Sequence, residues 1–139
     1  MKLFETIVDI DAAPATVRDI MCDVERWHEW TRSISRVALI GTGELKVGAR
    51  ALVRQPKLPP ALWRVTAVDA DGFTWVSRGP GLLATGRHYV APAGSGSRAT
   101  LSLAYEGLFS PLMARLAGPI TERYIGYEAE GLKRRAESA

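Results

Sequence analysis

The chain has 139 residues, 47% of them hydrophobic and 24% charged, and its formal net charge at pH 7 is +3. This length and balance are typical of one domain with a substantial core, and the mild, scattered positive charge argues against a nucleic-acid partner. The single cysteine, Cys22, excludes an internal disulfide framework and a multi-cysteine metal site.

The N-terminal sequence "MKLFETIVDID" carries acidic residues where a signal peptide needs an apolar stretch. No apolar run in the chain approaches the roughly 20 residues that a membrane-spanning helix needs. We therefore expect a cytoplasmic protein without membrane insertion.

The chain is expected to begin with a strand and two short helices. Residues 3–10 alternate between apolar and polar side chains, which predicts a half-buried strand. Pro14 suits the first turn of a helix, and the apolar residues of "ATVRDIMCDV" recur at helical spacing, which predicts one apolar helix face. A second short helix is expected over "ERWHEW", residues 25–30.

Strands are predicted to dominate the middle of the chain. The alternation is clearest near the end of this region, where Leu101, Leu103 and Tyr105 share one face. The breaks between the alternating segments are short and rich in Gly, Pro, Asp and Ser, which favours turns and predicts an antiparallel meander. The expected strands cover residues 34–40, 48–54, 61–69, 72–77, 84–91 and 98–107.

A long amphipathic helix is expected over about residues 110–136. Its apolar stripe is predicted to contain Met113, Leu116, Ala117, Ile120, Tyr124, Tyr127 and Gly131. Most of the charged residues, Glu128 among them, are assigned to the other faces. The order of elements predicts an α+β fold, in which a curved antiparallel sheet of about seven strands wraps around this helix and two short helices follow the first strand.

Three segments carry a resemblance to a known family: "AAPATVRDIMCDVERWHEWTRSI", "RHYVAPAGSGSRATLSLAYEG" and "FSPLMARLAGPITERYIGYEAEGLKRRAE". The chain resembles the START-like (SRPBCC, helix-grip) superfamily, specifically its polyketide cyclase/dehydrase and lipid-transport branch. The resemblance extends over nearly the whole chain and implies a single ligand-binding domain over residues 1–139. Cyclases, lipid carriers and hormone carriers share this fold, so the function has to be argued from the pocket.

The tryptophan-rich segment "VERWHEWTRSI" is interpreted as scaffold. Trp27 and Trp30 lie three residues apart and share a helical face, which favours a wedge between helix and sheet. His28 points off that face and is expected to be exposed. The segment begins like the zinc motif H-E-x-x-H, but Arg32 stands where the second histidine is needed, so no metal site is expected.

His88 is the candidate for chemistry. Strand alternation places it with Gly86 on the less polar face, which should line a concave interior. A histidine there is suited to general acid–base chemistry near neutral pH. The interpretation we favour for His88 is a structural hydrogen bond to Tyr105 or to a backbone carbonyl, with acid–base chemistry as the alternative. The same alternation puts Arg87 and Glu106 on the convex face, away from any ligand.

An apolar, aromatic-rich cavity is predicted between the sheet and the long helix. Its expected ligand-binding residues are Trp63, Phe73, Trp75, His88, Tyr105, Met113, Ala117, Ile120, Tyr124 and Tyr127. Small residues expected on inward faces favour a hollow interior: Ala49, Ala51, Ala67, Gly86 and Ala117. The segments 54–62 and 78–86 are predicted to form the rim.

These features favour a protein that binds a hydrophobic or aromatic small molecule, lipid-like or polyketide-like, without a cofactor. The alternative is a polyketide cyclase/dehydrase, in which His88 with Tyr105 or Tyr124 moves protons during aldol closure and water loss. A second alternative is a protein-interaction module with exposed apolar residues in "LPPALW" and "GPGLLA". A homodimer is compatible with each of the three.

Overall fold

A computed structural model describes residues 1–41 and 43–139 of the chain. Nine of its ten elements are strands or α-helices, and the tenth is a 3-10 helix. The elements follow the order β1 (Lys2–Ile10), α1 (Pro14–Cys22), η1 (Val24–Glu29), β2 (Arg36–Ile40), β3 (Arg50–Arg54), β4 (Ala61–Asp69), β5 (Gly72–Gly79), β6 (Leu82–Ala93), β7 (Gly96–Glu106) and α2 (Ser110–Glu137).

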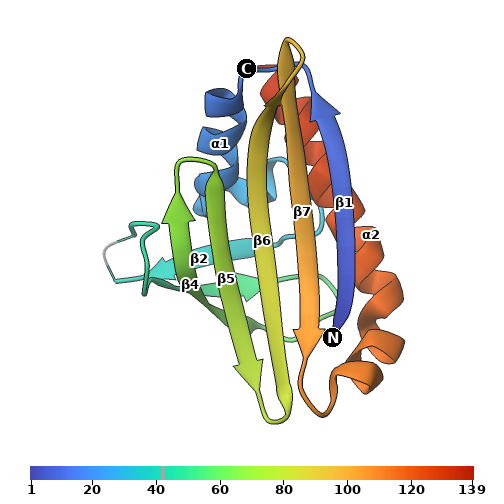
Figure 1. Ribbon diagram of the computed structural model, residues 1–139. Helices are drawn as coiled ribbons and strands as arrows, with labels where there is room; N and C mark the ends of the chain where they lie inside the picture. The colour runs from blue at the N-terminus through green and yellow to red at the C-terminus, as the bar shows by residue number, and fades with distance from the viewer. Residues whose placement is uncertain (42) are drawn as a thin grey trace.

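All seven strands form one antiparallel sheet in the order β1-β7-β6-β5-β4-β3-β2. The strands β2 to β7 form a meander, and β1 pairs with the last strand, so α1 and η1 connect the two edges of the sheet. The long helix α2 runs beside β1 and β7 (Figure 1). The predicted helix-grip architecture, with a long terminal helix and two short helices after the first strand, is confirmed.

Trp27 forms the wedge that joins the short helices to the sheet. Its side chain is 1% exposed, and its indole Nε1 donates a hydrogen bond to the Met21 carbonyl oxygen at 2.9 Å. Trp30 lies one turn of 3-10 helix later with its ring centroid 5.7 Å away, because residues i and i+3 lie on the same side of such a helix. His28 is exposed, so the predicted wedge of Trp27 and Trp30 and the predicted exposure of His28 are confirmed.

A β-bulge in β4 overturns one predicted orientation. Val65 pairs with Trp75, but Ala67 pairs with Thr74, so Thr66 is an extra residue on this strand. The extra residue reverses the faces beyond it: Val68, rather than Ala67, packs against the core. The inward position predicted for Ala67 is therefore wrong, because strict alternation does not survive a bulge.

Glu29 ties the end of η1 to the last turns of α2. Its carboxylate accepts hydrogen bonds from Arg26 Nε at 3.1 Å and from an Arg135 guanidinium nitrogen at 2.7 Å. The bonds from Arg26 and Arg135 lower the pKa of this carboxyl group from 4.5 to about 2. Because the folded state has the lower pKa, the pairing stabilises it above pH 4.5, and this stabilisation is lost as the pH falls toward 2.

We expect Glu29→Gln to reduce the loss of thermal stability on acidification. The melting temperature Tm, followed by circular dichroism from about pH 7 to about pH 2, should fall less steeply in the variant than in the native protein below pH 4.5. Glu130→Gln, at an exposed position of α2, the helix that carries Arg135, is the matched control and should leave the curve unchanged. Identical curves for Glu29→Gln and the native protein would contradict the pairing.

Candidate functional site

A cavity lies between the inner face of the sheet and α2, and it has two adjoining parts. The larger part, called here the outer chamber, has a volume of about 300 Å³. The smaller part, the inner chamber, has a volume of about 70 Å³. The two chambers meet at residues that line both of them: Gln55, Trp63, Leu103, Ile125 and Glu128.

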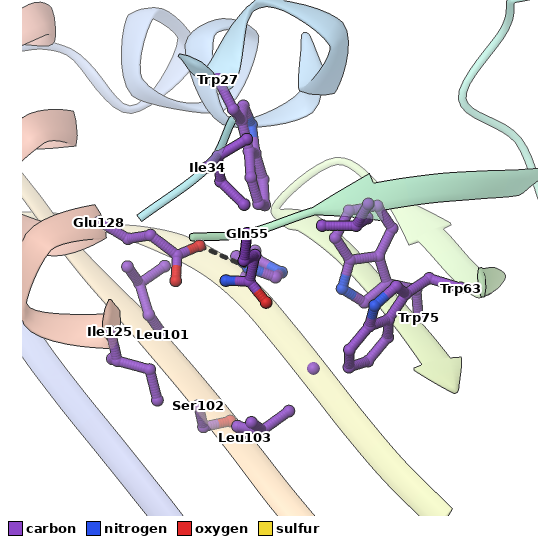
Figure 2. A pocket seen from close by; sticks show the side chains of 13 residues that line it. Trp27, Ile34, Gln55, Trp63, Trp75, Leu101, Ser102, Leu103, Ile125 and Glu128 are labelled. Atoms are coloured by element: carbon purple, nitrogen blue, oxygen red, sulfur yellow. Dashed lines mark ion pairs between the residues drawn. The ribbon is translucent and has the colours of Figure 1, made fainter. Parts of the chain in front are cut away.

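Aromatic side chains surround His88 at the inner chamber. The imidazole stacks on the Phe73 ring, with centroids 4.7 Å apart and an angle of 13° between the planes. The indole of Trp27 lies 4.9 Å away, and that of Trp75 lies edge-on at 5.8 Å. Trp75 and Trp63 line the other side of this chamber (Figure 2). Packing on three rings fixes the imidazole in one orientation.

Glu128 projects from α2 toward His88, and the dashed line in Figure 2 marks the contact between them. His88 Nε2 and Glu128 Oε1 are 3.8 Å apart, and their side chains are 9% and 12% exposed. The other ring nitrogen, His88 Nδ1, is buried and has no hydrogen-bond partner in the described part of the chain. A base and an acid thus share the end of an apolar cavity, an arrangement able to bind or move a proton.

The position of Glu128 corrects the predicted stripe of α2. The residues of α2 that face the interior include Thr121, Ile125 and Leu132, at helical spacing with Glu128 between them. Leu116, which was assigned to the stripe, is 72% exposed. The prediction separated charged from apolar residues and so moved Glu128 to the solvent side, whereas the helix turns it into the cavity.

The two candidate tyrosines lie around the outer chamber, but their hydroxyl groups have partners in the protein. The Tyr105 hydroxyl is 3.0 Å from Thr121 Oγ1, and the Tyr124 hydroxyl donates a hydrogen bond to the Pro56 carbonyl oxygen. Burial raises the pKa of Tyr105, although the bond with Thr121 opposes the shift.

Tyr105 does not lie beside His88. It pairs with Ala84, four residues along β6 from His88, which is roughly 13 Å at the rise of an extended strand. The polar side chain that the structure brings to His88 is Glu128. The expected hydrogen bond between His88 and Tyr105 is therefore absent from the described residues.

The remaining predicted ligand-binding residues divide into two groups. Met113 and Ala117 line the outer chamber with Trp63. Phe73, Ile120 and Tyr127 line neither chamber. Phe73 is fully buried behind His88, and the Tyr127 ring lies 3.9 Å beneath the Arg32 guanidinium carbon. On α2, the residues that line the chambers near these positions are Ile125 and Glu128.

Residues from both predicted rim segments line the outer chamber. Leu58 and Pro59 come from the β3–β4 connection, and Arg78 and Leu82 come from the ends of β5 and β6. Gln55 also comes from the first of these segments, and the structure adds lining residues that were not predicted, chiefly Thr121, Ile125 and Glu128.

The apolar patch predicted for the interaction-module alternative is present only in part: Leu62 is 46% exposed, and Pro59 and Pro60 are exposed as well. Leu58 and Leu82 are half-buried and line the cavity. Further exposed leucines lie just before α2, at Leu108, and in its first turns, at Leu112 and Leu116. Arg87 and Glu106 are exposed, as predicted for side chains directed away from the cavity.

Among the described residues, no helix is long and apolar enough to cross a membrane.

A seven-stranded sheet around a long C-terminal helix, with a cavity between them, defines a START-like helix-grip protein. The sequence matches the family described as "Polyketide cyclase / dehydrase and lipid transport" over residues 1–137. The chain belongs to this family. No curated protein matches the sequence significantly.

Solved structures share the fold at low sequence identity. A protein from Thermus thermophilus is 17% identical, with a TM-score of 0.79 over 99% of this chain and 98% of that one. A norcoclaurine synthase point mutant from Thalictrum flavum, in complex with a transition state analogue, is 14% identical, with a TM-score of 0.75 over 99% and 94% of the chains. A START superfamily protein from Mycobacterium smegmatis is 18% identical, with a TM-score of 0.72 over 98% and 97%. At these identities the likeness establishes the fold.

Proposed function

We propose that this protein binds a hydrophobic or aromatic small molecule, lipid-like or polyketide-like, between the sheet and α2. The observation that carries the proposal is the outer chamber of about 300 Å³, which adjoins the inner chamber. This volume is at the lower end of the range for small-molecule sites, roughly 300–1,000 Å³. The ligand is therefore compact, and membership of the family supports an apolar one.

The lining supports the same conclusion. Apolar and aromatic side chains, such as Trp63, Leu103 and Met113, form most of the chamber wall, and polar groups are few. Binding to such a wall is favourable because it removes the apolar surface of the ligand from water. The cytoplasmic location expected from the sequence stays a prediction, as does a homodimer.

We expect Ala117→Phe to block binding by filling the outer chamber. Ala117 lines that chamber, and a phenyl ring there competes with the ligand for the same volume. Overpacking of this kind costs about 1–3 kcal/mol, so the affinity should fall about 10- to 100-fold. The measurement is a titration with the neutral dye N-phenyl-1-naphthylamine, followed by its fluorescence and by quenching of the tryptophans.

Leu116→Phe is the matched control, because Leu116 is the preceding residue of the same helix and is 72% exposed. The control should bind the dye like the native protein. Equal dye binding by both variants would place the dye outside the chamber. No dye binding by the native protein would overturn the proposal of an apolar site.

The contact between His88 and Glu128 favours a second candidate function, that of a polyketide cyclase/dehydrase. A neighbouring acid and base at the end of an apolar cavity can remove and return protons while the walls hold a reactive polyketone folded. In this case His88→Ala should retain ligand affinity but lower the rate of cyclisation by roughly 100-fold. If the protein only binds its ligand, a poly-β-keto thioester should cyclise no faster in the presence of the protein than in its absence.

A further inference from the structure

The inner chamber contains a carboxylate that the protein itself leaves without a hydrogen bond. The contact of Glu128 with His88 Nε2, at 3.8 Å, is longer than a hydrogen bond. No other described residue donates a hydrogen bond or forms an ion pair with this side chain, which is 12% exposed. A carboxylate has about four lone-pair sites, so most of its capacity as an acceptor is unused.

The surroundings of this carboxylate are largely apolar. Trp75, Leu101 and Ile125 line the same chamber and offer the Glu128 carboxylate no hydrogen bond. The nitrogen His88 Nδ1 is also buried without a partner in the described part of the chain. Proteins seldom leave a buried polar atom such as His88 Nδ1 without a partner, and the free acceptor sites of Glu128 lie beside it in the same chamber. This arrangement suits a site that is completed by its ligand.

The charges around the cavity indicate which ligand group belongs there. Among the described residues that line the two chambers, Arg78 is the only arginine or lysine, and it lies exposed in the outer chamber. A ligand carboxylate or phosphate at the inner chamber would face Glu128 with no fixed cation nearby. A protonated amine there gains both a hydrogen bond to the carboxylate and contact with the tryptophan faces.

We propose that the inner chamber recognises a hydrogen-bond-donating end of the ligand, best a protonated primary amine, with Glu128 as the acceptor. This inference rests on the proposed binding function and specifies the ligand class as aromatic amines with a compact apolar body. The inner chamber of about 70 Å³ holds the amine, and the outer chamber of about 300 Å³ holds the rings.

A matched ligand series tests the inference on the native protein. The probes share a naphthalene body and differ at one group: 1-naphthylmethylamine, 1-naphthylmethanol, 1-methylnaphthalene and the anion of 1-naphthaleneacetic acid. We expect affinity to fall in that order. A hydrogen bond to a charged group contributes about 1.5–3 kcal/mol, so the amine should bind about 10- to 100-fold more tightly than methylnaphthalene.

Glu128→Gln should remove most of this preference, so that the ratio of the affinities for the amine and for methylnaphthalene falls toward one. Glu130→Gln, an exposed position two residues along α2, should change neither affinity. If methylnaphthalene binds and the amine shows no preference, the inference is wrong while the proposed function stands. If neither methylnaphthalene nor the neutral dye binds, the proposed function fails as well. Should Glu128→Gln not fold, as judged by circular dichroism, the order of affinities in the native protein still decides.

Discussion

Replacing Trp27 by alanine is expected to lower the free energy of unfolding by about 3–5 kcal/mol, the range for large aromatic residues removed from a core. Trp27 is 1% exposed, and its ring contacts those of Trp75 and His88, with centroids 5.4 Å and 4.9 Å away. The variant also loses the hydrogen bond to the Met21 carbonyl oxygen. Urea denaturation followed by circular dichroism measures the effect.

His28→Ala is the control, because this neighbouring side chain is exposed, and surface substitutions usually stay within about 0.5 kcal/mol. A loss below about 1 kcal/mol for Trp27→Ala would be smaller than the cost of an unfilled core site and would contradict the wedge. Trp27 also lines the inner chamber. The same substitution should therefore alter ligand binding, since one side chain serves both the core and the site.

The sheet was predictable because alternation with a period of two directly separates its two faces. Leu101, Leu103 and Tyr105 were assigned inward, and the pairing of β7 with β1 places Leu103 opposite the buried Phe4. Short turns between successive strands then restrict the pairing to an antiparallel meander. These rules depend on local sequence alone, which is why the fold follows from it.

The bulge in β4 was not predictable in the same way. It occurs at Thr66, between Val65 and Ala67, where no glycine or proline marks an interruption. Pairing with β5 fixes the position of the bulge, and that pairing lies outside the local pattern. Any inward residue predicted beyond such a point falls on the wrong face, as Ala67 did.

Glu128 was missed for a different reason. The rule that charged residues of an amphipathic helix face water holds for a solid core, but here α2 covers a cavity. Thr121, Ile125, Glu128 and Leu132 follow the spacing i, i+4, i+7 and i+11, which is a helical stripe. A carboxylate within such a stripe is the signal that could have indicated a site.

The close approach of α2 to η1 leads to the second large effect, a loss of stability in Gly131→Ala. A Cβ atom at Gly131 would overlap the Trp30 carbonyl oxygen and lie 2.9 Å from the carbonyl carbon. Alanine normally stabilises a helix by about 0.5–1 kcal/mol relative to glycine. Here the helix has to move away from backbone atoms, and overpacking of this kind costs about 1–3 kcal/mol or more.

Gly126→Ala, in the same helix, is the control and is expected to have the opposite effect on the free energy of unfolding. A Cβ atom there meets nothing within 4 Å, so this variant should gain about 0.5–1 kcal/mol. The measurement is urea denaturation of both variants. If the two substitutions shift the denaturation midpoint in the same direction, the close contact is contradicted.

Gly131 follows Glu128 by one turn, so a displaced helix also moves the carboxylate away from His88. Gly131→Ala should therefore weaken the preference for the amine probe as well as the fold, whereas Gly126→Ala should preserve both.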